Sequence, residues 1–117
     1  MSKVINFWVL QVTGERVLEL RFADVRAVTQ HKDVYLNPMS VHQSHQIIDF
    51  IQKWEGFDMV VNCAAGISRS GAIALFLHTN FGYNLKPNFW KMSEPNPFCY
   101  GTLVVEYFKL KVSSQMR

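Results

Sequence analysis

The chain of 117 residues contains no long hydrophobic run, no repeat and no low-complexity tract. The longest apolar stretch near its N-terminus, Val4–Leu10, is interrupted by Asn6 and is too short to span a bilayer. It also has no small-residue cleavage site of the signal-peptide type, so we expect a cytoplasmic protein that does not associate with membranes. With 49% hydrophobic and 18% charged residues, the composition predicts a single globular domain over residues 1–117.

Cysteine is scarce, and charge is not clustered. The two cysteines, Cys63 and Cys99, are too few for a disulfide framework and indicate free thiols in a reducing compartment. The net charge is +3, and the lysines and arginines are scattered along the chain. No nucleic-acid partner is therefore expected. A modest attraction for anionic substrates is the main consequence of the positive charge.

β-branched and aromatic residues dominate two segments near the N-terminus. Residues 3–11 (KVINFWVLQ) and 17–22 (VLELRF) are predicted to be strands, separated by the turn-like sequence TGE. Residues 23–37 show no clean period and are predicted to be a loop.

A helix is predicted to begin after Ser40, because Gln43 follows three residues later in a capping-box pattern. Apolar residues then recur at helical spacing until Gly56 ends the run. The predicted buried face of this helix contains Ile47, Ile48, Ile51 and Trp54.

The middle of the chain alternates between strand and helix patterns. Residues 57–62 form a short apolar run without alternation, as in a strand buried on both sides. Residues 68–78 favour a helix with Ile73, Phe76 and Leu77 on its apolar face. The order helix, strand, loop, helix indicates an α/β domain, for which we expect a central, mostly parallel sheet flanked by helices.

The C-terminal third predicts two further helices. Residues 86–92 are predicted to be a short helix, and the two prolines of SEPNP predict a loop over 93–97. A final helix is predicted over 99–112. Its apolar face is expected to contain Leu103, Val104, Tyr107 and Phe108.

The stretch VVNCAAGISRSG, residues 60–71, joins the predicted buried strand to the next helix. Such a connection presents the first N–H groups of the helix at the carboxyl edge of the sheet, where they bind anions. Small residues let successive amides point inward as a nest, and Gly66 can adopt a positive φ without strain. The predicted phosphate-binding residues are Ala64, Ala65, Gly66, Ile67, Ser68 and Arg69.

Cys63 lies at the rim of this predicted cradle, where the amides and the helix dipole favour a thiolate. Arg69, six residues later, can hold two phosphate oxygens in bidentate fashion, which a lysine cannot do. Ser70 is placed to donate a hydroxyl hydrogen bond to the sulfur and help it leave in a second step. These three residues predict nucleophilic phosphoryl transfer.

The sequence CAAGISRS, from Cys63 to Ser70, resembles the C-x5-R-S/T signature loop of the cysteine-dependent protein tyrosine phosphatases. It is most similar to the dual-specificity branch and its compact bacterial and phage relatives. The resemblance extends upstream through IIDFIQKW and FDMVVN and more weakly downstream to PNP at 95–97. It implies a hydrolase that forms a phosphocysteine intermediate on Cys63 without a metal or cofactor. The expected substrate is a phosphorylated protein or a small phosphomonoester.

The resemblance also implies an aspartate that acts as general acid, and two residues compete for this role. Asp24 lies just after a predicted strand, as in the family, but 63 − 24 = 39 residues before the cysteine. Asp33 lies 63 − 33 = 30 residues before it, a more usual spacing, but no predicted strand precedes it. We favour Asp24 because of the strand and keep Asp33 as the alternative general acid.

Two asparagines are predicted to support the loop. Asn62 stands where the family usually has a histidine directly before the nucleophile, and an amide makes hydrogen bonds there without charge. Asn96, in the PNP segment, is expected to brace the active-site loop or to shape a turn. Because of Asn62, a phosphate-binding interaction module with weak or no catalysis is the alternative function. His42 and His45 share a helix, but no further histidine or cysteine near them in the sequence completes a metal site.

Overall fold

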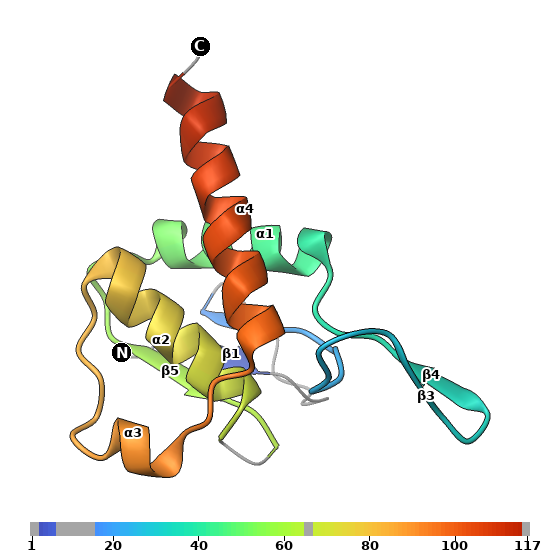
Figure 1. Ribbon diagram of the computed structural model, residues 1–117. Helices are drawn as coiled ribbons and strands as arrows, with labels where there is room; N and C mark the ends of the chain where they lie inside the picture. The colour runs from blue at the N-terminus through green and yellow to red at the C-terminus, as the bar shows by residue number, and fades with distance from the viewer. Residues whose placement is uncertain (1–2, 7–15, 65–66, 116–117) are drawn as a thin grey trace.

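The computed structural model describes residues 3–6, 16–64 and 67–115, and within them the predicted α/β domain is confirmed (Figure 1). Five short strands and four helices form the described part of the chain. In order, the elements are β1 (Lys3–Asn6), β2 (Val17–Glu19), β3 (Thr29–His31), β4 (Val34–Leu36), α1 (Val41–Lys53), β5 (Met59–Asn62), α2 (Arg69–Phe81), α3 (Phe89–Met92) and α4 (Pro97–Gln115).

Three strands form one sheet, in the order β2-β1-β5. Strand β1 pairs in parallel with β2, where Val4 is opposite Val17, and in parallel with β5, where Asn6 is opposite Asn62. Strand β2 ends at Glu19, three residues before the predicted end at 22. The rest of the first predicted strand, residues 7–11, and the TGE turn lie outside the described residues.

The prediction of a loop over residues 23–37 is wrong, because β3 and β4 pair as an antiparallel hairpin within it. Lys32 and Asp33 form its two-residue turn, and Lys32 adopts a positive φ of 56°. The backbone N–H of Ala23 donates to Asn37 O at 2.8 Å and closes the base of the hairpin. The described side chains of β3 and β4 are mostly exposed, so no alternation of buried and exposed residues marks these strands in the sequence.

Helix α1 begins as the sequence predicts, at a complete capping box. Gln43 N donates to Ser40 Oγ, and Ser40 N donates to Gln43 Oε1, both at 3.0 Å. Gln43 also donates from Nε2 to Arg21 O at 2.7 Å, which ties the start of α1 to the segment after β2. Beyond the end of the helix, Gly56 has φ +91°, a conformation that L side chains rarely adopt. The isoleucines of the predicted buried face are buried.

Strand β5 is confirmed, but its predicted burial on both sides is wrong. Val60 is 40% exposed and Phe57, just before the strand, is 51% exposed. Among the described strands, β5 pairs with β1 alone, so it lies at the edge of the sheet. Helix α2 starts one residue later than predicted and continues to Phe81, with its predicted apolar contacts buried.

The two C-terminal helices differ from the prediction at their ends. Helix α3 spans 89–92 rather than 86–92, and α4 starts at Pro97, inside the predicted loop. Proline suits the first turn of a helix, because the N–H groups there have no partner within the helix. The prediction that Phe108 faces the core is wrong, since it is 66% exposed. The C-terminal half of α4 extends beyond the rest of the molecule, and Phe108 lies on it (Figure 1).

Helices α1, α2 and α4 enclose the core, and a polar group links two of them. Glu106 of α4 is 7% exposed and lies 2.9 Å from His45 Nε2 of α1 and 3.2 Å from Lys109 Nζ. The hydrogen bond with His45, followed by the bond and charge of Lys109, holds the pKa of Glu106 below its usual value against the effect of burial.

In the described part of the chain, no helix combines the length and the apolar character needed to cross a membrane.

Candidate functional site

Cys63 directly follows strand β5, and helix α2 begins six residues later at Arg69. The side chain of Cys63 is buried, with 5% of its surface exposed. Of the predicted phosphate-binding residues between Cys63 and Arg69, Ala65 and Gly66 lie outside the described residues. Ala64 and Ile67, on either side of them, are exposed. Strand, loop and helix therefore follow one another as the sequence predicts.

The sulfur of Cys63 contacts the first turn of α2. The backbone N–H of Ser70 donates to Cys63 Sγ at 3.4 Å, and a hydrogen bond of 3.2 Å joins Sγ to Ser70 Oγ. Because an ionised sulfur has no proton to give, the hydroxyl of Ser70 would be the donor to a thiolate. Two donors and the positive end of the helix then face the sulfur, an arrangement that favours its charged form.

Arg69 is anchored beside the same turn. Its Nη1 donates to Phe22 O, just before Asp24, at 2.7 Å. Its Nε is buried and has no hydrogen-bond acceptor among the described residues. A buried donor without a partner is costly, so this N–H is suited to an anion that binds at the loop.

Asp24 lies against the loop, and Asp33 does not. The hydroxyl of Ser68 donates to Asp24 Oδ1 at 2.8 Å. Ser68 occupies the N-cap position of α2 but makes no side-chain cap there, so its hydroxyl binds the aspartate instead of a helix N–H. Asp33 is in the turn of the β3–β4 hairpin, which projects away from the helices (Figure 1). The structure thus brings only the first of the two candidate acids to the loop.

Asn96 makes several hydrogen bonds near the loop, and it is 5% exposed. Its Nδ2 donates to Asp24 Oδ1 at 2.8 Å and to Val25 O at 3.2 Å. Its Oδ1 accepts from the backbone N–H groups of Phe98 and Cys99 in the first turn of α4. Its own N–H donates to Ser68 O at 3.0 Å. The predicted loop-supporting residue thus contacts the aspartate as well as the loop.

The segment 93–95 packs closely on the start of α2. Glu94 N donates to Ile67 O at 3.3 Å. A Cβ on Gly71 would lie 3.3 Å from Ser93 Cβ and 3.5 Å from Pro95 Cα, so a side chain at this position would have little room. Gly71 is not predictable from the sequence as a site residue, because its role depends on a segment more than 20 residues away.

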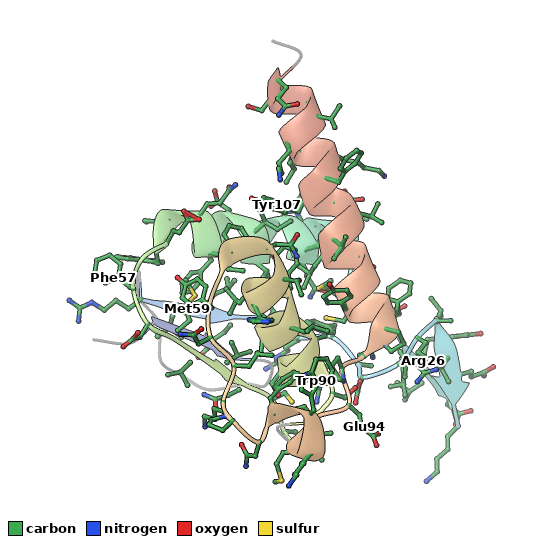
Figure 2. The ribbon with its side chains drawn as sticks, turned by 60° about the vertical axis from the view of Figure 1, so that its left-hand side comes forward. Arg26, Phe57, Met59, Trp90, Glu94 and Tyr107 are labelled. Atoms are coloured by element: carbon green, nitrogen blue, oxygen red, sulfur yellow. The ribbon has the colours of Figure 1, made fainter. Side chains whose placement is uncertain are left out.

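A pocket of about 320 Å³ opens on the Asp24 side of the loop. Arg26 and Glu94, both labelled in Figure 2, contribute its opposite charges. The other lining residues are Asp24, Ser68, Pro95, Asn96 and Pro97. A group that leaves a phosphate held at the loop would have space here, directly beside the carboxyl of Asp24.

Cys99 is a thiol of a different kind. It is 2% exposed, and its Sγ lies 3.9 Å from Met39 Sδ. Burial, with a further contribution from the charge of Asp24, raises the pKa of Cys99 to about 12. It is therefore protonated at neutral pH and is not a competing nucleophile.

The remaining site predictions concern Asn62 and metal binding. Asn62 is the last residue of β5 and is opposite Asn6 in the parallel pairing with β1. Within residues 3–6, 16–64 and 67–115, no group of three histidine, cysteine or acidic side chains is arranged to hold a metal ion.

In comparisons with known proteins, no family model matches the chain and no curated protein matches it.

Proposed function

We propose that this chain is a cysteine-dependent phosphatase of the protein tyrosine phosphatase type, similar to the dual-specificity branch. The observation that carries the proposal is the placement of Cys63 Sγ against the N–H and hydroxyl of Ser70, with Asp24 bonded to the adjacent Ser68. A nucleophile, its stabilising donors and an acid are then gathered at one helix N-terminus. In this proposal the scaffold is a central, mostly parallel sheet flanked by helices.

The first step transfers the phosphoryl group to the cysteine. The Cys63 thiolate attacks the phosphorus, the S–P bond forms, and the bond from phosphorus to the ester oxygen breaks. The carboxylic acid of Asp24 gives its proton to the departing oxygen. Loop N–H groups and the guanidinium of Arg69 stabilise the charge on the three other phosphate oxygens.

The second step releases phosphate. Asp24, now ionised, removes a proton from a water molecule that attacks the phosphorus. The S–P bond breaks and its electron pair returns to sulfur. The hydroxyl of Ser70, 3.2 Å from Sγ, stabilises the returning thiolate by a hydrogen bond. Inorganic phosphate leaves, and the enzyme regains its starting state.

We propose phosphorylated proteins or small phosphomonoesters as substrates, turned over in the cytoplasm without metal or cofactor. The pocket beside Asp24 has a volume of about 320 Å³ and is lined mainly by polar and charged residues and prolines, which favours a permissive site over one limited to phosphotyrosine. Phosphoserine peptides should therefore be hydrolysed as well as phosphotyrosine peptides.

The experiment that tests this proposal is hydrolysis of 4-nitrophenyl phosphate in the presence of a metal chelator, for wild type, Asp24→Asn and Asp33→Asn. We expect vanadate-sensitive turnover by the wild-type chain. Asp24→Asn should lose about 10²-fold or more in overall rate, because Asp24 also acts as the base in the second step, and acid–base catalysis of this kind contributes about 10²–10⁴-fold. Asp33→Asn should retain its rate, because Asp33 lies in the turn of the exposed hairpin.

The two aspartate variants control for each other, because each removes one exposed loop carboxylate. A large loss in Asp33→Asn with full activity in Asp24→Asn would reverse the assignment of the acid. A wild-type chain that hydrolyses no phosphate ester would overturn the proposed function.

Asn62 favours the second candidate function, a module that binds phosphorylated partners without hydrolysing them. It stands at the position where the resembling family carries a histidine, and a neutral amide supports the thiolate less than a charged ring does. Binding of phosphate or vanadate without turnover supports this second function, and turnover gained by Asn62→His would identify the missing element.

A further inference from the structure

We propose that Asn96 is the positioning residue for the general acid, holding Asp24 against the loop in the orientation that proton transfer needs. This inference rests on the proposed function and adds to it. Asn96 is predicted from sequence as a support of the cysteine loop. The geometry points to a second task, because its side-chain amide binds Asp24 directly.

Asp24 needs a support because no helix or strand holds it. Asp24 lies between β2 and β3, and it is exposed. An exposed side chain samples several rotamers, and holding it in one orientation costs conformational entropy. A buried donor that is already fixed reduces that cost at the moment of reaction.

Asn96 is such a donor. It is 5% exposed, and its Nδ2 divides its hydrogen bonds between Asp24 Oδ1 at 2.8 Å and Val25 O at 3.2 Å. One bond fixes the carboxyl group and the other fixes the backbone beside it. A single amide therefore holds both the side chain of Asp24 and the main chain of the segment that carries it, residues 20–28, which we call the acid loop.

Three hydrogen bonds hold Asn96 itself in place. Its Oδ1 accepts two N–H groups from the first turn of α4, and its N–H donates to Ser68 O. Prolines at 95 and 97 restrict the backbone on both sides. Asn96 therefore joins the acid loop to α4 through its side-chain amide, and to the cysteine loop through its backbone N–H, with little freedom of its own.

The bonds to Asp24 also select which oxygen carries the proton. Asn96 Nδ2 and Ser68 Oγ both donate to Oδ1, each at 2.8 Å. An oxygen that accepts two hydrogen bonds is a poor place for a proton, so the acidic proton of Asp24 is assigned to Oδ2. Loss of Asn96 would leave the carboxyl group free to turn and would lower the fraction of productive orientations.

The test uses Asn96→Ser and measures kcat/KM for phenyl phosphate and for 4-nitrophenyl phosphate. Serine still caps α4, since it is as good an N-cap as asparagine, but its side chain is too short to reach Asp24 as the amide does. Phenolate is the poorer leaving group and depends more on the acid. We expect a loss of about tenfold or more for phenyl phosphate and less than about threefold for 4-nitrophenyl phosphate.

A double variant with Asp24→Asn separates positioning from a general structural role. If Asn96 acts through Asp24, Asn96→Ser should cause no further loss of kcat/KM in the Asp24→Asn chain. Equal losses for both esters, or losses that multiply in the double variant, would overturn the positioning role while the phosphatase function stands. If the wild type hydrolyses neither ester, the proposed function fails and the positioning role fails with it.

Discussion

Replacing Cys63 by serine is expected to abolish hydrolysis of phosphate esters, with a loss on the order of 10⁴-fold or more. The reason is chemical, because a serine hydroxyl is not ionised at neutral pH, whereas a cysteine at this position can react as a thiolate. The size changes little, so the hydrogen bonds to Ser70 N and Oγ can persist. Initial rates with 4-nitrophenyl phosphate measure the effect.

The other cysteine provides the matched control. Cys99→Ala removes a buried thiol whose pKa is raised to about 12, and we expect turnover close to that of the wild type. Phosphate or vanadate binding should survive in Cys63→Ser, since the loop amides and Arg69 remain. Full activity in Cys63→Ser, or its loss in Cys99→Ala from a chain that is still folded, would show that the nucleophile is assigned to the wrong residue.

The second large effect is expected from Arg69→Lys, which keeps the charge and removes the planar fork. A lysine contacts phosphate as a point charge and cannot place two N–H groups on two oxygens. It also loses the 2.7 Å bond from Nη1 to Phe22 O that sets the direction of the side chain. Loss of one transition-state donor costs about 10²–10³-fold, and we expect kcat to fall by at least about 10²-fold.

Arg21→Lys is the control for this variant. Arg21 is exposed and directly precedes Phe22, so the same change of side chain is made beside the site without touching the loop. Its kcat should equal that of the wild type. If Arg69→Lys retains full kcat and weakens only KM, then Arg69 contributes to substrate binding alone and the proposed stabilisation of the transition state is wrong.

Local signals in the sequence predicted the elements that carry the candidate site. The capping box at Ser40 and Gln43 is formed by neighbours three residues apart, and it places the start of α1 correctly. The change from an apolar run to a small-residue loop and then to helical spacing placed β5, Cys63 and α2 in the right order. In each case the residues that determine the structure are close together in the chain.

Features that depend on distant residues were not predictable in the same way. The hairpin over 29–36 was missed because its described side chains face solvent on both sides and leave no alternating pattern. The close packing at Gly71 depends on Ser93 and Pro95. The bond between Asp24 and Asn96 joins residues 72 positions apart, and only the folded chain reveals which aspartate lies beside the loop.

The covalent mechanism requires phosphate to be attached to Cys63 during turnover, and this phosphate can be detected. Asp24→Asn should slow hydrolysis of the intermediate more than its formation from 4-nitrophenyl phosphate, because that leaving group depends least on an acid. The variant would be denatured within the first turnover without acid, because the S–P bond is labile in acid, and analysed by peptide mass spectrometry. We expect a phosphorylated peptide that contains Cys63 and disappears in the double variant with Cys63→Ser. Continued turnover with Cys63 unmodified, or phosphate on another residue, would contradict it.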